Sequence, residues 1–111
     1  MVVGVCRIVL LLPGNGSLKA KRAIIRSLLE RMRNRYNTAV AEVDDLDNRR
    51  RATVAFAVLS NDRRHANSML DQIGSFVTAN TEAVVADRAT ELISLGEELG
   101  MEALAGEPGK P

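Results

Sequence analysis

Few residues in this chain can support metal, redox or stacking chemistry. Its 111 residues include one cysteine, one histidine and no tryptophan, and aromatic residues make up only 3%. A lone cysteine excludes an internal disulfide, and one cysteine with one histidine cannot complete a zinc site. The shortage of aromatic side chains excludes binding of nucleic acid by rows of stacked bases. We therefore expect no metal and no cofactor, and a binding protein rather than an enzyme.

The sequence also lacks a long hydrophobic run. Residues 1–12 are apolar but carry Arg7 in their middle, and they fall short of the roughly 20 apolar residues that span a bilayer. They lack the basic start and cleavage site of a signal peptide. The run therefore predicts a buried strand, no membrane span and a cytoplasmic location. With 46% hydrophobic and 26% charged residues, the composition is that of one ordinary globular domain.

Two periodicities divide the chain into six elements. Alternating or continuous apolar residues predict strands over residues 2–12, 38–43, 51–59 and within 82–95, the last centred on Val84 and Val85 and interrupted near Asp87 and Arg88. Helical spacing predicts one helix over residues 18–36. A second helix follows the capping residues 60–62, with Asn61 as N-cap, and ends at Asn80. The order βαββαβ predicts an α+β ferredoxin-like sandwich, a four-stranded antiparallel sheet with both helices on one face. We place this domain at residues 1–95 and expect a flexible tail at 96–111.

Both faces of the central strands are apolar. In residues 2–12 both faces are apolar apart from Arg7, and in the third strand Ala55, Ala57 and Leu59 lie opposite Val54, Phe56 and Val58. An exposed apolar face of this kind marks an interface. We therefore expect a homodimer formed through the sheet face. The alternative is that the tail folds over this face through its apolar residues Leu95, Leu99, Met101 and Leu104.

The net charge of +1 hides an asymmetry. Residues 1–36 hold eight basic residues and one acid, net +7, whereas residues 37–111 hold seven basic residues and thirteen acids, net −6. At 100° per residue, four cations of the first helix fall within a stripe of about 60°: Lys19, Arg22, Arg26 and Arg33. Lys21, Arg31 and Arg35 lie on the opposite flank, and Lys21 is expected to support the stripe.

The stripe has two interpretations. It is typical of a surface that binds the phosphates of a polyanion, here RNA. The alternative is a solvated helix face whose cations pair with acids in or just after the second strand: Glu42, Asp44, Asp45 and Asp47. The loop that precedes the helix is a separate candidate site, where Gly14, Gly16 and Ser17 hold an anion at the helix N-terminus. The loop lacks the spacing of a Walker motif. Its alternative role is a turn in which Ser17 caps the helix.

His65 is the one candidate for acid–base chemistry. Together with Glu42 and Asp62 it forms a candidate functional cluster for a small enzyme or ligand-binding module, provided that the fold brings the three side chains within hydrogen-bond reach. The alternative is a histidine that packs at the edge between helix and sheet.

Several short motifs occur in an order that resembles one family. They are Val3-Gly4-Val5-Cys6, Gly16-Ser17-Leu18-Lys19 followed by Lys21-Arg22, Ala41-Glu42-Val43-Asp44, and Ser60-Asn61-Asp62 followed by His65. Over residues 2–93 the chain is similar to the YlxP-like family of bacterial proteins of unknown function, and it departs from the family at Ala20, where an acid is common. The resemblance implies a ferredoxin-like fold and a small cytoplasmic protein. Members are often encoded beside translation-factor and ribosome-maturation genes, which implies a role near the ribosome. No catalytic residue is established for the family.

Taken together, the sequence predicts a non-enzymatic protein that contacts RNA or a ribosomal particle through its basic first helix. Without stacking aromatics we expect recognition of backbone and shape, and no readout of DNA sequence. Two alternatives stay open: a protein-interaction module that uses the apolar sheet face, and a small enzyme or ligand-binding module centred on His65.

Overall fold

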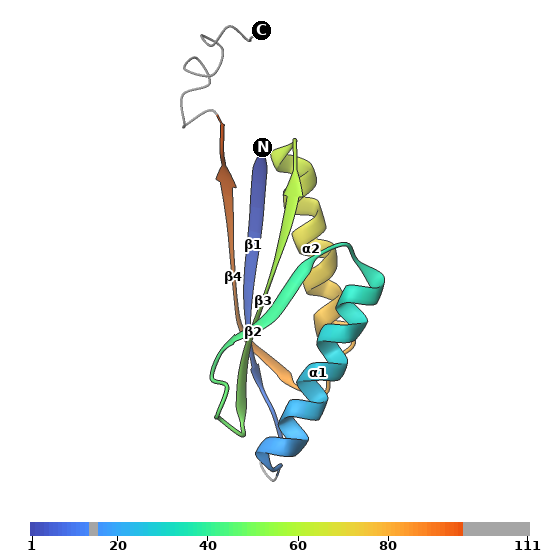
Figure 1. Cartoon of the computed structure of the whole chain (residues 1–111), viewed down its shortest axis with the longest axis vertical. Coiled ribbons are helices and arrows are strands. Elements are labelled where there is room, and N and C mark those ends of the chain that lie inside the picture. The colour runs from blue at the N-terminus through green and yellow to red at the C-terminus, as the bar shows by residue number, and fades with distance from the viewer. Residues whose placement is uncertain (14–15, 97–111) are drawn as a thin grey trace, which may run out of the picture.

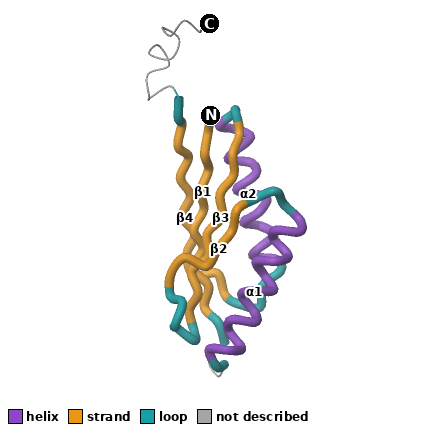
Figure 2. Tube along the Cα trace, in the orientation of Figure 1, coloured by secondary structure: helices purple, strands orange, loops and turns teal. Residues whose placement is uncertain are grey.

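Six elements follow one another in the order that the sequence predicts. The structure is a computed structural model that describes residues 1–13 and 16–96. Its elements are β1 (Val2–Leu11), α1 (Leu18–Arg35), β2 (Ala39–Asp44), β3 (Arg51–Ser60), α2 (Arg63–Ala79) and β4 (Val84–Ser94). Figure 1 shows both helices on the same side of the sheet, and Figure 2 shows the four strands as one layer beside them. Gly14 and the expected tail from residue 97 onward lie outside the described residues.

The four strands form one antiparallel sheet in the order β2-β3-β1-β4. The central strands pair in full register, from Val2 opposite Ser60 to Leu11 opposite Arg51. This topology, with two helices on one face, is the ferredoxin-like α+β sandwich. The predicted fold class is therefore confirmed.

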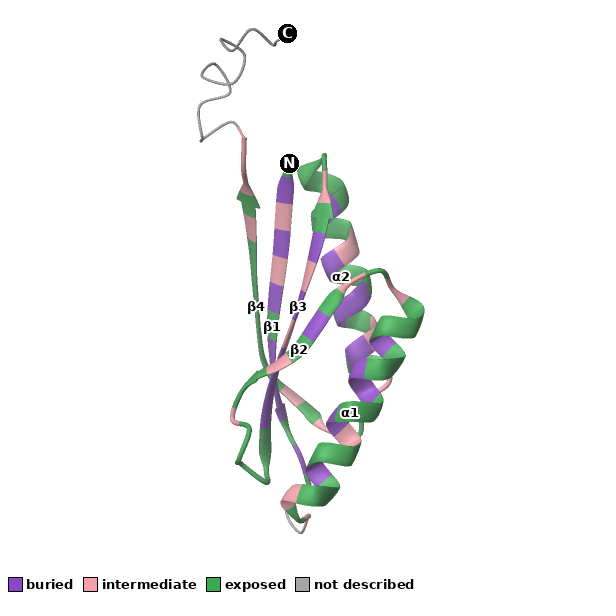
Figure 3. Cartoon of the chain, in the orientation of Figure 1, coloured by how far each residue is buried: buried purple, intermediate pink, exposed green. Residues whose placement is uncertain are grey.

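The core lies between the sheet and the helices. Even-numbered residues of β1, such as Ile8 and Leu10, are fully buried, as are Leu28 and Met32 of α1 and Leu70 of α2. Burial of each large apolar side chain stabilises the fold by about 1.5–3 kcal/mol. Figure 3 shows the resulting alternation along β1 and the exposed surface of β4.

Local details differ from the expectation in two places. The N-cap of α2 is Asp62 and not Asn61, because the Asp62 carboxylate accepts a hydrogen bond from the His65 backbone N–H. Strand β4 continues through Asp87 and Arg88 without interruption; its irregularity is a shift of register between the pairs Val9–Asp87 and Leu10–Val85. The extra residue is a bulge, which bends a strand without ending it.

Candidate functional site

The basic stripe runs along the side of α1 that borders the edge strand β2. Near the start of the helix, Nη2 of Arg22 lies 3.6 Å from a carboxylate oxygen of Asp47 in the β2–β3 loop. Near its end, Nη2 of Arg33 donates to the carbonyl oxygen of Val40 in β2 at 3.2 Å. Because both contacts reach β2 or the loop that follows it, the stripe faces this edge of the molecule. The helix is long enough to carry the stripe for about 21 Å, at 1.5 Å per residue from Lys19 to Arg33.

Most of the positive charge on the stripe is free to meet an external anion. Lys19, Arg22, Arg26 and Arg33 are all exposed. Within residues 1–13 and 16–96, Lys19 and Arg26 take part in no ion pair. The Arg22–Asp47 pair is loose, with 53% and 92% of the two side chains exposed, and exposed pairs contribute only about 0–1 kcal/mol. The alternative in which acids of residues 42–47 neutralise the stripe therefore holds for Arg22 only, and weakly.

Lys21 does not belong to this surface. Its side chain is only 1% exposed, and its Nζ lies 2.7 Å from Oε2 of Glu42. The same Nζ donates to the carbonyl oxygens of Asp45, at 2.6 Å, and Leu46, at 3.4 Å. The expectation that Lys21 supports phosphate binding is wrong, because its side chain is buried between α1 and β2 and holds the start of the β2–β3 loop.

One further exposed cation at this end of α1, Arg49, is not predicted by the sequence. Arg49 lines a cavity of about 180 Å³ together with Gly16, Ala20 and Lys21. It therefore lies against the start of α1, on the flank opposite Arg22. The run Arg49-Arg50-Arg51 is visible in the sequence, but only the fold shows that Arg49 meets the helix, whereas Arg51 is bound to Asp45.

The loop before α1 is described from Gly16 onward. The hydroxyl of Ser17 accepts a hydrogen bond from the backbone N–H of Ala20 at 3.0 Å, and the Ser17 carbonyl accepts from Lys21 N–H. Ser17 is thus the N-cap of α1, as the capping interpretation predicts. Of the candidate anion loop, Gly16 also lines the cavity beside Arg49, and Gly14 lies outside the described residues.

The candidate cluster of Glu42, Asp62 and His65 is not assembled. Glu42 pairs with Val54 in the sheet, six residues before the end of β3 at Ser60, which is a separation of about 20 Å at 3.4 Å per residue. Asp62 and His65 lie beyond that end, where Asp62 caps α2. Glu42 is therefore engaged with Lys21, and His65 is an exposed residue of the first turn of α2.

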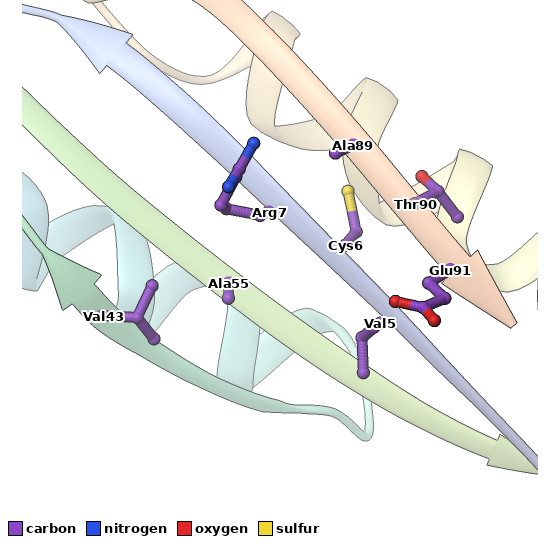
Figure 4. Close-up of a pocket in the computed structure, with 8 residues that line it drawn as sticks. All are labelled: Val5, Cys6, Arg7, Val43, Ala55, Ala89, Thr90 and Glu91. Atoms are coloured by element: carbon purple, nitrogen blue, oxygen red, sulfur yellow. The ribbon is translucent and has the colours of Figure 1, made fainter. Parts of the chain in front are cut away.

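The open face of the sheet carries a hollow with a mainly apolar lining. Residues from all four strands line a hollow of about 320 Å³: Val5, Cys6 and Arg7 of β1, Val43 of β2, Ala55 of β3, and Ala89, Thr90 and Glu91 of β4 (Figure 4). Leu11, Val43, Leu59, Val84 and Ile93 are the exposed large apolar residues of the four strands. This surface is the unpartnered apolar face that the sequence predicts.

Toward the β2–β3 loop the same face becomes polar. Asp45 accepts hydrogen bonds from the Thr53 hydroxyl at 2.6 Å and from Nε of Arg51 at 3.0 Å. The Thr53 hydrogen bond is the main reason that the pKa of Asp45 lies below its ordinary value of 3.8, with the Arg51 and Lys21 cations adding to it and desolvation opposing it. Asp45 also adopts a positive φ of 60°, a conformation that Asp and Asn tolerate better than other side chains. This end of the face is thus held together by its own charges.

Among the described residues, no three His, Cys, Asp or Glu side chains come together in a way that could hold a metal ion. No helix in that part of the chain is both long and apolar enough to cross a bilayer.

Three comparisons place the chain among known proteins. The family described as "Protein of unknown function (DUF503)" matches residues 3–90. The chain is 30% identical over 67 residues to "Uncharacterized protein YlxP" of Bacillus subtilis (strain 168), covering 60% of this chain and 73% of that protein. A solved structure from Thermobifida fusca YX, described as a dimeric ferredoxin-like protein of unknown function, matches with a TM-score of 0.39 and 14% identity over 84% of this chain and 92% of the other.

Proposed function

Since the chain belongs to the DUF503 family of proteins of unknown function, we propose from its surface that it is a cytoplasmic, non-enzymatic binding protein that contacts RNA phosphates through α1. The observation that carries this proposal is the stripe of Lys19, Arg22, Arg26 and Arg33, exposed along one side of a single helix. Such a stripe attracts a polyanion regardless of its sequence.

The aromatic residues of the chain support backbone recognition over base recognition. Tyr36 and Phe76 pack against each other with ring centroids 5.5 Å apart, and the guanidinium of Arg35 lies 5.8 and 5.9 Å from the two centroids. These rings are occupied by intramolecular contacts, whereas base readout in RNA relies on rings that bases can stack on. The RNA is therefore held by its phosphates and its shape, as in a folded ribosomal particle.

Cosedimentation with ribosomal particles at low salt tests this proposal. The Arg22→Glu, Arg26→Glu double variant should lose cosedimentation, because it turns two attractive charges of the stripe into repulsive ones. The matched control is Arg31→Glu, on the opposite flank of α1. Nε of Arg31 donates to the Ser27 carbonyl of its own helix, and Arg31 forms no ion pair within residues 1–13 and 16–96. Cosedimentation that persists in the double variant, or that is lost equally in the control, contradicts the role of the stripe.

The open sheet face supports a second candidate function, protein association through a homodimer. Its carrying observation is the apolar hollow formed by all four strands on the side away from the helices. Sedimentation velocity at micromolar concentration should return the mass of two chains, and a monomeric mass would reject this candidate. Pull-down before and after nuclease treatment separates a protein partner on this face from RNA bound to α1.

A further inference from the structure

Two opposite charges flank the hollow on the open sheet face. Arg7 pairs with Ala89 across β1 and β4, and Val5 pairs with Glu91 one step further along. The odd-numbered residues of β1 point away from the helices, because the even-numbered residues form the core. Arg7 of β1 and Glu91 of β4 therefore lie diagonally across from each other on the open face. Both residues line the hollow (Figure 4).

Neither charge has a strong partner within the described chain. Nη2 of Arg7 lies 3.4 Å from Oδ2 of Asp87, with more than half of each side chain exposed. Glu91 forms no ion pair with any basic group in residues 1–13 and 16–96. By contrast, Arg51 at the polar end of the face is already bound to Asp45.

We propose that a second copy of the chain covers this face, with Arg7 of each protomer paired to the partner's Glu91. In a two-fold symmetric interface, a contact from one residue to a second is repeated in the reverse direction. A two-fold axis in the plane of the interface that bisects the line from Arg7 to Glu91 at a right angle brings each residue over the other. One axis therefore produces two identical ion pairs. This inference rests on the homodimer of the preceding subsection and adds its geometry.

The surroundings of the two charges suit a dimer. Ala55 and Ala57 of β3 and Ala89 of β4 are small, so that a second sheet can approach closely. Strands of about 34 Å, with about 15 Å between the outer ones, give a face of roughly 500 Å² before side-chain relief is counted. Stable interfaces bury about 800 Å² of accessible surface per partner, which a corrugated face of this size approaches.

The charge pattern favours a second copy over a nucleic acid on this face. On the open face, β1 and β4 contribute one cation, Arg7, and two acids, Asp87 and Glu91, because Arg88 of β4 is turned toward α2 and bonds Asp71 there. Phosphates on this face would therefore meet net repulsion. A copy of the same face offers the Glu91 carboxylate to Arg7 and the Arg7 guanidinium to Glu91. Charges arranged in this way fix the register of two apolar surfaces.

Charge exchange between two variants tests the pairing. Arg7→Glu alone and Glu91→Arg alone should each weaken self-association at least tenfold, because two like-charge contacts replace two attractive ones. An equimolar mixture of the two variants should restore the dimer, since both contacts are then complementary. Restoration also shows that each variant is folded. The matched control Asp87→Asn removes only the loose contact within one protomer and should leave the dimer intact.

The outcomes separate this inference from the proposals on which it rests. A wild-type chain that sediments as a monomer overturns the pairing and the homodimer together. A wild-type dimer whose single variants remain dimeric, or whose mixture fails to recover, overturns the pairing alone. Cosedimentation with ribosomal particles should be unchanged in Arg7→Glu, because α1 lies on the other side of the sheet (Figure 1).

Discussion

Lys21 and Glu42 form a buried ion pair that joins the first turns of α1 to the edge strand β2. Their Nζ and Oε2 atoms are 2.7 Å apart, with 1% and 13% of the side chains exposed. Oε2 receives no aligned hydrogen bond, so the contact is chiefly coulombic. Nζ of Lys21 also donates hydrogen bonds to the carbonyl oxygens of Asp45 and Leu46. The pair therefore fixes the helix, the strand and the β2–β3 loop relative to one another.

Removing one partner of this pair should destabilise the fold strongly. Lys21→Ala leaves the Glu42 carboxylate largely buried without a counter-charge, and we expect a loss of about 3 kcal/mol in the free energy of unfolding. The Lys21→Met, Glu42→Leu double variant should recover most of that loss, because an apolar pair needs no compensation. Urea unfolding of Lys21→Met, Glu42→Leu and the double variant measures the coupling between the two residues. Additive effects of the two single changes would show that the residues do not interact.

Two buried glycines should respond differently to alanine. A Cβ on Gly4 would meet Cδ1 of Leu70 at 2.8 Å and Cγ2 of Val58 at 3.1 Å, inside the core between β1 and α2. Gly4→Ala should therefore cost about 1–3 kcal/mol of stability through overpacking.

The matched change at Gly74 meets a movable neighbour. A Cβ there would contact the guanidinium of Arg88, the far end of a flexible side chain that is 31% exposed. Alanine is more favourable than glycine inside a helix by about 1 kcal/mol of stability. This gain offsets the loss of the hydrogen bonds that Arg88 donates to the Leu70 carbonyl and the Asp71 carboxylate. Thermal unfolding should show a large shift for Gly4→Ala and a small one for Gly74→Ala, and equal shifts would contradict the difference in packing.

The lowered pKa of Asp45 makes part of the stability depend on pH. Because its pKa in the folded state is below the ordinary value of 3.8, the charged form stabilises the fold fully above that value. The contribution is lost as the pH falls through the folded pKa. Thr53→Val removes the main hydrogen bond to the carboxylate, so its destabilisation should be present at pH 7 and smaller at pH values below the folded pKa.

Asp45→Asn supplies the control for this titration. Asparagine tolerates the positive φ of this position but does not titrate. Urea unfolding across the acid range should therefore show a shallower pH dependence for Asp45→Asn than for the wild type. Identical pH profiles for the two proteins would show that Asp45 does not contribute to the dependence.

The sequence predicted the fold well because hydrophobic periodicity determines it. The helix face with Ile25, Leu28 and Met32 and the alternation in β1 follow from spacing alone. The N-cap of α2 was misplaced by one residue because residues 60–62 are all good capping types, and only the hydrogen bond of Asp62 decides among them.

The site was less predictable because it depends on partners far apart in the chain. Lys21 lies among the basic residues of α1, and helical spacing alone does not show that Glu42 lies beneath it. Position on the helix wheel also could not show that Arg49 reaches the same end of α1, since that contact depends on the path of the β2–β3 loop. Glu42 and His65 belong to the same domain, but they lie toward opposite ends of β3, and the sequence does not show this separation.

The central claim, that the α1 stripe binds RNA phosphates, is tested most directly by the salt dependence of binding to a fluorescently labelled single-stranded RNA. Four phosphate contacts predict a slope of about −2.8 in log K against log [salt], at about −0.7 per contact on single strands. Arg26→Ala should reduce the magnitude of this slope by about 0.7 and Arg31→Ala should leave it unchanged. A wild-type slope near zero, or the same slope in the wild type and Arg26→Ala, would contradict the claim.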